Sequence, residues 1–166
     1  MAEIVKSAGG IIYFFDEEGE PKFLLIKRHA LSGKMERVAP KGKIQKGETE
    51  KEAALREIGE EIWVQKQHLI IKSLLGTTTL RSSETQTGHL DKDVTYFLIK
   101  YTGDPSLIKI IEGEGYIGIY KRMDIQQIIN LIFYEDLREL IRKAYFLIKE
   151  EQKNQSVKQS FIDQLG

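Results

Sequence analysis

The feature that most constrains this chain is a run of glycine, lysine and glutamate residues between positions 42 and 64. The run reads Gly42-Lys-Ile-Gln-Lys-Gly-Glu48, then seven residues, then Arg56-Glu57-Ile58-Gly59-Glu60-Glu61-Ile62-Trp63-Val64. Its second half places three carboxylates close together near the end of a predicted helix, where like charges repel and the helix dipole favours cations. Hard divalent cations would relieve this repulsion, because Mg²⁺ prefers carboxylate and phosphate oxygen.

The predicted helix runs from about Thr49 to Ile62, because Thr49 and Glu52 have the spacing of a capping box. At about 100° per residue, one apolar stripe should face the core: Ala54, Leu55, Ile58 and Ile62. Three glutamates share the adjacent stripe: Glu50, Glu57 and Glu61. Glu60 lies on the flank of this stripe, and the small Ala53 is expected to leave room beside it for ions. The alternative is an ordinary solvated acidic face, since Arg56 lies four residues from both Glu52 and Glu60. The glycine, glutamate and arginine at fixed spacing favour the metal site.

Residues 42–64 resemble the Nudix box of the Nudix hydrolases, whose pattern is Gly-x5-Glu-x7-Arg-Glu-apolar-x-Glu-Glu-x-Gly-apolar. Every position matches except the last glycine, which is Trp63 here. The segment from Ser7 to Ile12 also resembles the first strand of that family, and Lys92 to Phe97 resembles a later one. A glycine at the end of the box lets the helix end in a left-handed turn. With Trp63 we expect the helix to end differently or to run slightly further.

The resemblance implies a fold and a set of site residues. The fold is of the α/β class, a Nudix-type α/β/α sandwich with a mixed β-sheet, over residues 1–151, with a tail or short helix at 152–166. In the family, the matching glutamates hold the divalent ions and carry the catalysis: Glu57, Glu60 and Glu61. The residue matching Lys41 gives a backbone carbonyl ligand, and three further positions are structural: Gly42, Glu48 and Arg56. A glutamate outside the box often acts as ligand or general base, for which Glu112 is the candidate and Glu114 the second choice.

The implied reaction is metal-dependent hydrolysis of a phosphoanhydride in a nucleoside diphosphate linked to another group, with Mg²⁺ as the metal and Mn²⁺ as the alternative. The stretch from Pro40 to Glu48 resembles both the diadenosine and the diphosphoinositol polyphosphate hydrolases, and Phe133 to Arg138 resembles the former. We therefore expect a dinucleoside polyphosphate such as diadenosine tetraphosphate, giving ATP and AMP. The residues expected to contact substrate are Lys43 and Arg28 on phosphate and Tyr134 on a base, with Tyr96 and Tyr116 as other aromatic candidates.

Three other functions stay open at this stage. An RNA 5′-pyrophosphohydrolase or a nucleoside triphosphate pyrophosphohydrolase would use the same metal site. A non-catalytic nucleotide-binding module would share the fold, although such modules commonly lose box carboxylates, and all three are intact here.

Composition narrows the partners. Lys plus Arg and Asp plus Glu are 25 each, so no net positive field favours nucleic acid, beyond a capped or triphosphorylated RNA end. The chain has no cysteine, which excludes a thiolate nucleophile and fits a reducing cytoplasm. No apolar run approaches membrane-spanning length, so no membrane partner is expected. We expect a small-molecule nucleotide substrate and a monomer or homodimer.

The remaining sequence alternates between strand and helix patterns. Strands are expected at Ala8 to Phe15, Phe23 to Lys27, Ile70 to Leu80, Val94 to Tyr101 and Tyr116 to Tyr120. A polar segment from Arg81 to Asp93 is a candidate substrate loop. Asp124 can cap a short helix, and a long amphipathic helix follows with this apolar stripe: Leu137, Leu140, Ile141, Ala144 and Ile148.

Overall fold

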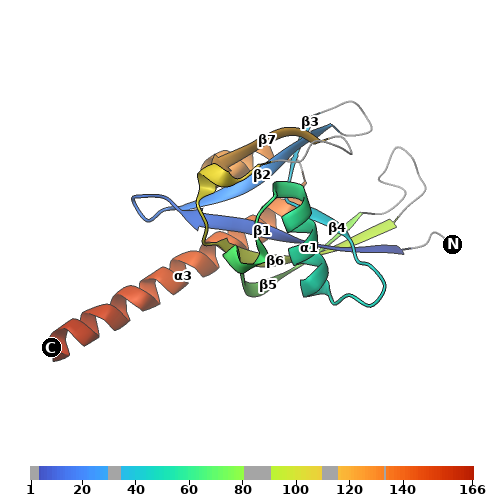
Figure 1. The fold of residues 1–166 in the computed structure, drawn as a ribbon. Helices are drawn as coiled ribbons and strands as arrows, with labels where there is room; N and C mark the ends of the chain where they lie inside the picture. The colour runs from blue at the N-terminus through green and yellow to red at the C-terminus, as the bar shows by residue number, and fades with distance from the viewer. Residues whose placement is uncertain (1–3, 30–34, 81–90, 110–115, 133) are drawn as a thin grey trace.

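The computed structural model describes residues 4–29, 35–80, 91–109, 116–132 and 134–166. Within these ranges, the side chains of residues 28–29, 35–36 and 116–123 are outside the description. The described residues form one mixed sheet with helices on both faces, which is the sandwich expected from the sequence (Figure 1).

The sheet has seven strands in the described part of the chain. Their bounds are β1 Ile4–Phe15, β2 Pro21–His29, β3 Met35–Val38, β4 Lys41–Lys43, β5 Leu69–Leu80, β6 Asp91–Tyr101 and β7 Tyr116–Met123. Five strands follow the order β3-β2-β1-β6-β5, while β4 pairs with β1 and β7 pairs with β2. The β1–β6 pair is parallel and the others are antiparallel, so the sheet is mixed.

Three α-helices cover the two faces of this sheet: α1 Glu50–Ile62, α2 Ile125–Leu131 and α3 Glu135–Leu165. Alternate residues of β1 point to opposite faces, as in any strand. Ile12 belongs to the core cluster beneath α1, whereas Tyr13 belongs to the cluster beneath α2 and α3. Both faces of the central strands are therefore buried, which gives the three layers.

Helix α1 lies close to the sheet because of a glycine in β1. A Cβ at Gly10 would come within 2.8 Å of the Ile58 Cδ1 atom and 2.7 Å of the Ile99 Cδ1 atom. The missing side chain lets Ile58 approach the strand, and Ile58 and Ile62 are both fully buried. Burial of each of these side chains contributes about 1.5–3 kcal/mol. Ala53, which was expected to leave room for ions, is also fully buried, so that expectation is wrong.

The last helix is longer than expected, because residues 152–165 continue α3. Three contacts hold its middle against the body: Lys149 Nζ to Glu20 at 2.8 Å, Lys72 Nζ to Glu151 at 2.7 Å, and Gln152 Nε2 to the Gly19 carbonyl at 2.8 Å. Past that point the helix projects away from the sheet (Figure 1). Within the described residues, no helix is both long and apolar enough to cross a bilayer.

Candidate active site

The start of α1 is set by a complete capping box. The Thr49 hydroxyl accepts from the Glu52 N–H at 3.1 Å, and the Glu52 carboxylate accepts from the Thr49 N–H at 3.3 Å. The two contacts satisfy backbone donors that the first helical turn leaves unpaired. The helix therefore begins where the sequence predicted, which fixes the direction in which its later carboxylates point.

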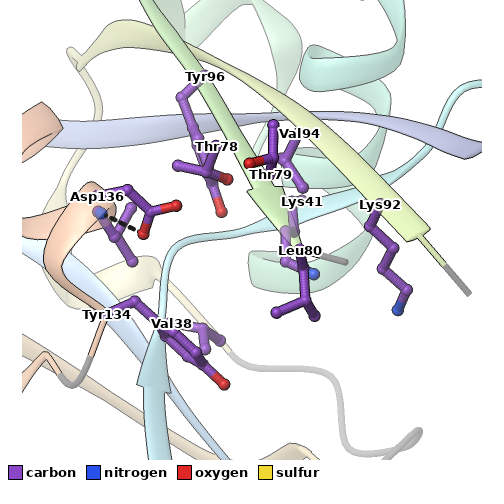
Figure 2. A pocket seen from close by; sticks show the side chains of 11 residues that line it. Val38, Lys41, Thr78, Thr79, Leu80, Lys92, Val94, Tyr96, Tyr134 and Asp136 are labelled. Atoms are coloured by element: carbon purple, nitrogen blue, oxygen red, sulfur yellow. Dashed lines mark hydrogen bonds between the residues drawn. The ribbon is translucent and has the colours of Figure 1, made fainter. Parts of the chain in front are cut away.

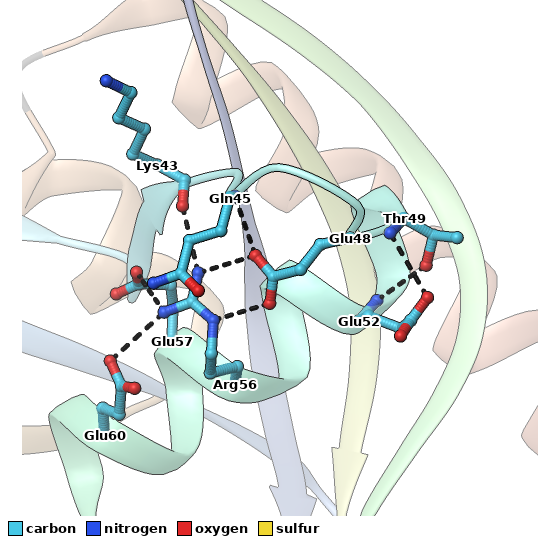
Figure 3. A network of polar contacts seen from close by, with 8 residues as sticks. All are labelled: Lys43, Gln45, Glu48, Thr49, Glu52, Arg56, Glu57 and Glu60. Atoms are coloured by element: carbon cyan, nitrogen blue, oxygen red, sulfur yellow. Dashed lines mark hydrogen bonds and ion pairs between the residues drawn. The ribbon is translucent and has the colours of Figure 1, made fainter.

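Arg56 ties the loop of the box to the helix. Its Nε and Nη2 donate to the two Glu48 carboxylate oxygens at 2.6 and 2.9 Å, and Nη2 also donates to the Lys43 carbonyl at 3.0 Å. Nη1 donates to Glu57 at 2.8 Å and to Glu60 at 3.3 Å (Figure 3). A planar guanidinium can hold several acceptors at once in this way. The expected pairing of Glu48 with Arg56 is present.

This pairing makes acid stability depend on Glu48. The hydrogen bond from Arg56, helped by the Gln45 N–H, lowers the pKa of Glu48 from 4.5 to about 2. A carboxyl group with a lowered pKa in the folded state contributes stability above its unfolded pKa, and this contribution is lost as the pH falls through the folded value. We expect the stability difference between wild type and Glu48→Gln to shrink between pH 4.5 and about 2. Urea unfolding at a series of pH values measures it, and a difference that stays constant over this window would contradict the pairing.

Two carboxylates of α1 meet the first two residues of β4. A Cβ at Gly42 would overlap the Glu57 carboxylate, so glycine is needed for that side chain to lie against the strand. The Glu61 carboxylate accepts a hydrogen bond from the Lys41 N–H at 3.2 Å and is mostly buried. The side chains of Glu57 and Glu61, both from α1, thus lie against neighbouring residues of the same short strand.

Glu60 is placed differently from the other two glutamates. Its side chain is 61% exposed, and its described contact is the one with Arg56. Across the described ranges, no three His, Cys, Asp or Glu side chains form a ready metal cluster. This arrangement still fits Mg²⁺, which is commonly held by one or two carboxylates together with substrate phosphates and water. The Glu57 carboxylate beside Gly42 and the Glu61 carboxylate beside Lys41 are hard oxygen donors of the right kind.

A pocket lies on the sheet face covered by α3, since Val94, Tyr96 and Leu137 belong both to its lining and to the core cluster beneath that helix. Its lining comes from five elements: Val38, Lys41, Thr78, Thr79, Leu80, Lys92, Val94, Tyr96, Tyr134, Asp136 and Leu137. Figure 2 shows Tyr134, from the start of α3, beside Val38 in this pocket. Lys41 belongs to both places, since its side chain lines the pocket and its N–H contacts Glu61.

The substrate residues expected from the sequence fall into two groups. Tyr134 and Tyr96 line the pocket, although Tyr96 is only 3% exposed and is mainly a core residue. Lys43 is exposed, and its ammonium points away from the glutamates in Figure 3. Glu112, Glu114 and the side chains of Arg28 and Tyr116 lie outside the described residues.

Sequence reasoning missed the strand ends that line the pocket, including Thr78, Thr79 and Lys92. A signal was available, because Thr78 and Thr79 closely precede the polar segment from Arg81 to Asp93 that was expected near the substrate, and Lys92 lies within its last residues. Most of that segment, residues 81–90, lies outside the described ranges.

Comparison with known proteins decides the family. A family model of the NUDIX domain matches residues 6–144. The chain belongs to the Nudix family. Nudix hydrolases generally use divalent metal ions and act on small nucleotide substrates, and this Nudix chain is a pyrophosphohydrolase. No curated protein sequence is significantly similar to it.

Solved structures of other Nudix proteins share the fold. The structure of a C. elegans Ap4A hydrolase binary complex is 26% identical, with a TM-score of 0.73, over 88% of this chain and 98% of that one. A second structure of C. elegans Ap4A hydrolase is 28% identical, with a TM-score of 0.66, over 87% and 99% of the two chains. E. coli dihydroneopterin triphosphate pyrophosphohydrolase, at 19% identity, a TM-score of 0.62 and 83% and 92% coverage, shares the fold alone.

The Nudix glycine that Trp63 replaces marks the end of α1. The expectation that the helix would end differently is wrong, because it ends at Ile62 and Trp63 itself adopts the left-handed conformation, with φ 48° and ψ 60°. The chain has to turn here toward β5, and the Ile62 carbonyl is held by the Lys109 N–H at 3.2 Å. A non-glycine residue in this conformation costs about 1–2 kcal/mol. Trp63 is the one non-glycine residue with positive φ in the described part of the chain.

Restoring glycine at this position should stabilise the Nudix domain. Trp63→Gly and Trp63→Ala both remove the ring, but only glycine removes the backbone strain. We expect Trp63→Gly to be about 1 kcal/mol more stable than Trp63→Ala, which corresponds to a melting temperature about 2–4 °C higher. Thermal unfolding of the two variants side by side tests this, and equal melting temperatures would show that the turn is not strained.

Proposed function

We propose that this Nudix hydrolase cleaves a phosphoanhydride bond in a dinucleoside polyphosphate such as diadenosine tetraphosphate, giving ATP and AMP, with Mg²⁺ as its metal and Mn²⁺ as the alternative. The observation that carries the proposal is the junction at Lys41. Its N–H contacts the Glu61 carboxylate at 3.2 Å, while its side chain lines the pocket that contains Tyr134. A nucleoside in the pocket would therefore lead its phosphates toward the glutamates of α1. The likeness to C. elegans Ap4A hydrolase supports the same substrate class.

Each residue of the site has a proposed task. Glu57, Glu61 and the Lys41 carbonyl would hold the metal ions, with Glu60 as a further ligand from the exposed side. Bound divalent ions supply charge neutralisation on phosphate oxygens and lower the pKa of bound water. Arg56 keeps Glu57 against Gly42 and holds the loop through Glu48. Tyr134 would stack on a base, Lys43 and Arg28 would contact phosphate, and Glu112 is the proposed general base.

We also propose that the reaction takes place in the cytoplasm. The absence of cysteine is compatible with the reducing cytoplasm, where nucleotides of this kind would be substrates.

A substrate panel with Mg²⁺ tests the proposal. We expect kcat/KM for diadenosine tetraphosphate to exceed that for ADP-ribose, ATP and 5′-triphosphorylated RNA. Lys43→Ala should reduce the ratio of kcat/KM for diadenosine tetraphosphate to kcat/KM for the other compounds, because Lys43 is proposed to contact the polyphosphate chain. Lys153→Ala is the matched control, since Lys153 is an exposed lysine on the far part of α3. A clear preference for ADP-ribose, ATP or triphosphorylated RNA would overturn the substrate, and the absence of turnover on every compound would favour a non-catalytic binding module.

A further inference from the structure

An exposed aromatic ring and a lysine lie together at the end of α1. The Trp63 side chain is 68% exposed, and the Lys109 Nζ atom lies 6.0 Å from the centre of its ring. The Lys109 N–H donates to the Ile62 carbonyl at 3.2 Å, which fixes the lysine segment to the helix end. The pair is therefore held in place by the backbone, with the ring open to solvent.

Neither packing nor backbone preference explains why a tryptophan occupies this position. The ring is not buried in the core, and the left-handed backbone is unfavourable for a bulky residue such as tryptophan, whereas glycine adopts it freely. Phe146 is similarly exposed, at 62%, but it lies in the regular part of α3 and carries no such strain. Strained backbone that burial does not explain is characteristic of binding and catalytic sites.

The position of Trp63 connects it to the reaction site. It follows Glu61 by two residues, so their Cα atoms are at most about 7.6 Å apart. Glu61 contacts Lys41, and Lys41 lines the pocket that contains Tyr134. Trp63 is not among the residues that line this pocket. Trp63 caps the C-terminal end of the helix that carries Glu57 and Glu61, so a long ligand that continued along this helix beyond the carboxylates would come to its ring.

The chemistry of the pair matches a nucleotide. The face of an indole ring stacks on a nucleobase, and a neighbouring ammonium group attracts phosphate. We propose that Trp63 and Lys109 bind the second nucleotide of a dinucleoside polyphosphate, Trp63 by stacking on its base and Lys109 by contacting the adjacent phosphate. The inference rests on the proposed function, in which the first nucleotide occupies the Tyr134 pocket.

Fluorescence gives a direct test, because Trp63 is the single tryptophan of the chain. AMP contains a base and a phosphate but no phosphoanhydride bond, so it can be titrated without turnover. We expect AMP to quench the emission of the wild-type protein and inorganic tripolyphosphate to leave it nearly unchanged. The quenching should persist in Tyr134→Ala, since it arises at Trp63 itself. Unchanged emission at saturating AMP, or quenching that disappears in Tyr134→Ala, would overturn the proposal.

Kinetics separates this inference from the proposed function. Trp63→Gly, which keeps the turn, should raise KM for diadenosine tetraphosphate about tenfold and leave kcat nearly unchanged. Trp63→Tyr should bring KM most of the way back to the wild-type value, and Phe146→Ala should have the KM of the wild type. An unchanged KM in Trp63→Gly, with cleavage intact, overturns the Trp63 site alone. Failure of the wild type to cleave diadenosine tetraphosphate overturns the proposed function, and the AMP titration then still shows whether Trp63 binds a nucleotide.

Discussion

Glu57→Gln and Glu61→Gln are each expected to lower kcat by about 100-fold or more at modest Mg²⁺. Replacing a residue that only supports a metal ligand already lowers metal affinity or activity by about 10–100-fold. Replacing a direct ligand should lower them at least as much. Glutamine keeps the size of the side chain and one oxygen acceptor, but it removes the charge that a divalent ion requires. Steady-state kinetics over a range of Mg²⁺ concentrations measures the effect, and the apparent metal affinity should fall in both variants.

The folded structure should survive these changes. In Glu61→Gln the remaining carbonyl oxygen can still accept the hydrogen bond from the Lys41 N–H. The matched control is Glu150→Gln, an exposed glutamate on α3, which should leave kcat unchanged. Near-normal turnover in both Glu57→Gln and Glu61→Gln, with the melting temperature of wild type, would show that neither carboxylate holds the metal.

Arg56→Ala is expected to lose stability and activity together. The substitution removes contacts to Glu48, Glu57, Glu60 and the Lys43 carbonyl, and it leaves the mostly buried carboxylates of Glu48 and Glu57 without their cation. Loss of such charged hydrogen bonds costs about 1–3 kcal/mol, or a melting temperature roughly 2–12 °C lower for a chain of this size. Activity should fall because Glu57 is no longer held beside Gly42.

Two variants separate the clamp from a general charge effect. Arg56→Lys keeps the positive charge but not the planar fork, so it should recover only part of the stability. Arg142→Ala removes an arginine that pairs with Glu135 and Glu139 on the surface of α3, and its melting temperature should stay close to that of wild type. If Arg56→Ala melts like Arg142→Ala, Arg56 does not clamp the loop.

The sequence predicted those parts of the fold in which local chemistry and tertiary packing agree. The capping boxes at Thr49 and Asp124 start α1 and α2 as expected, because each needs only residues close in sequence. The apolar stripe of α1 is buried at Ala54, Ile58 and Ile62, since a period of 3.6 residues specifies one face.

The parts that were missed depend on contacts that are distant in sequence. The short strand β4 consists of Lys41, Gly42 and Lys43, which have no strand pattern of their own, and it forms by pairing with β1. Ala53 was placed beside the glutamates by angle alone, but the sheet packs against it. The left-handed Trp63 was also missed, because local preference argues against that conformation and the turn toward β5 requires it.

Product analysis of diadenosine tetraphosphate cleavage tests the central claim most directly. The wild-type protein is incubated with the substrate and Mg²⁺ in ¹⁸O-labelled water, and a second reaction contains a metal chelator as the control. The products are separated, and their masses are measured by mass spectrometry. The account predicts ATP and AMP in equal amounts, with the label in one product only and no cleavage in the presence of chelator. Two molecules of ADP, or cleavage that continues without divalent metal, would contradict it.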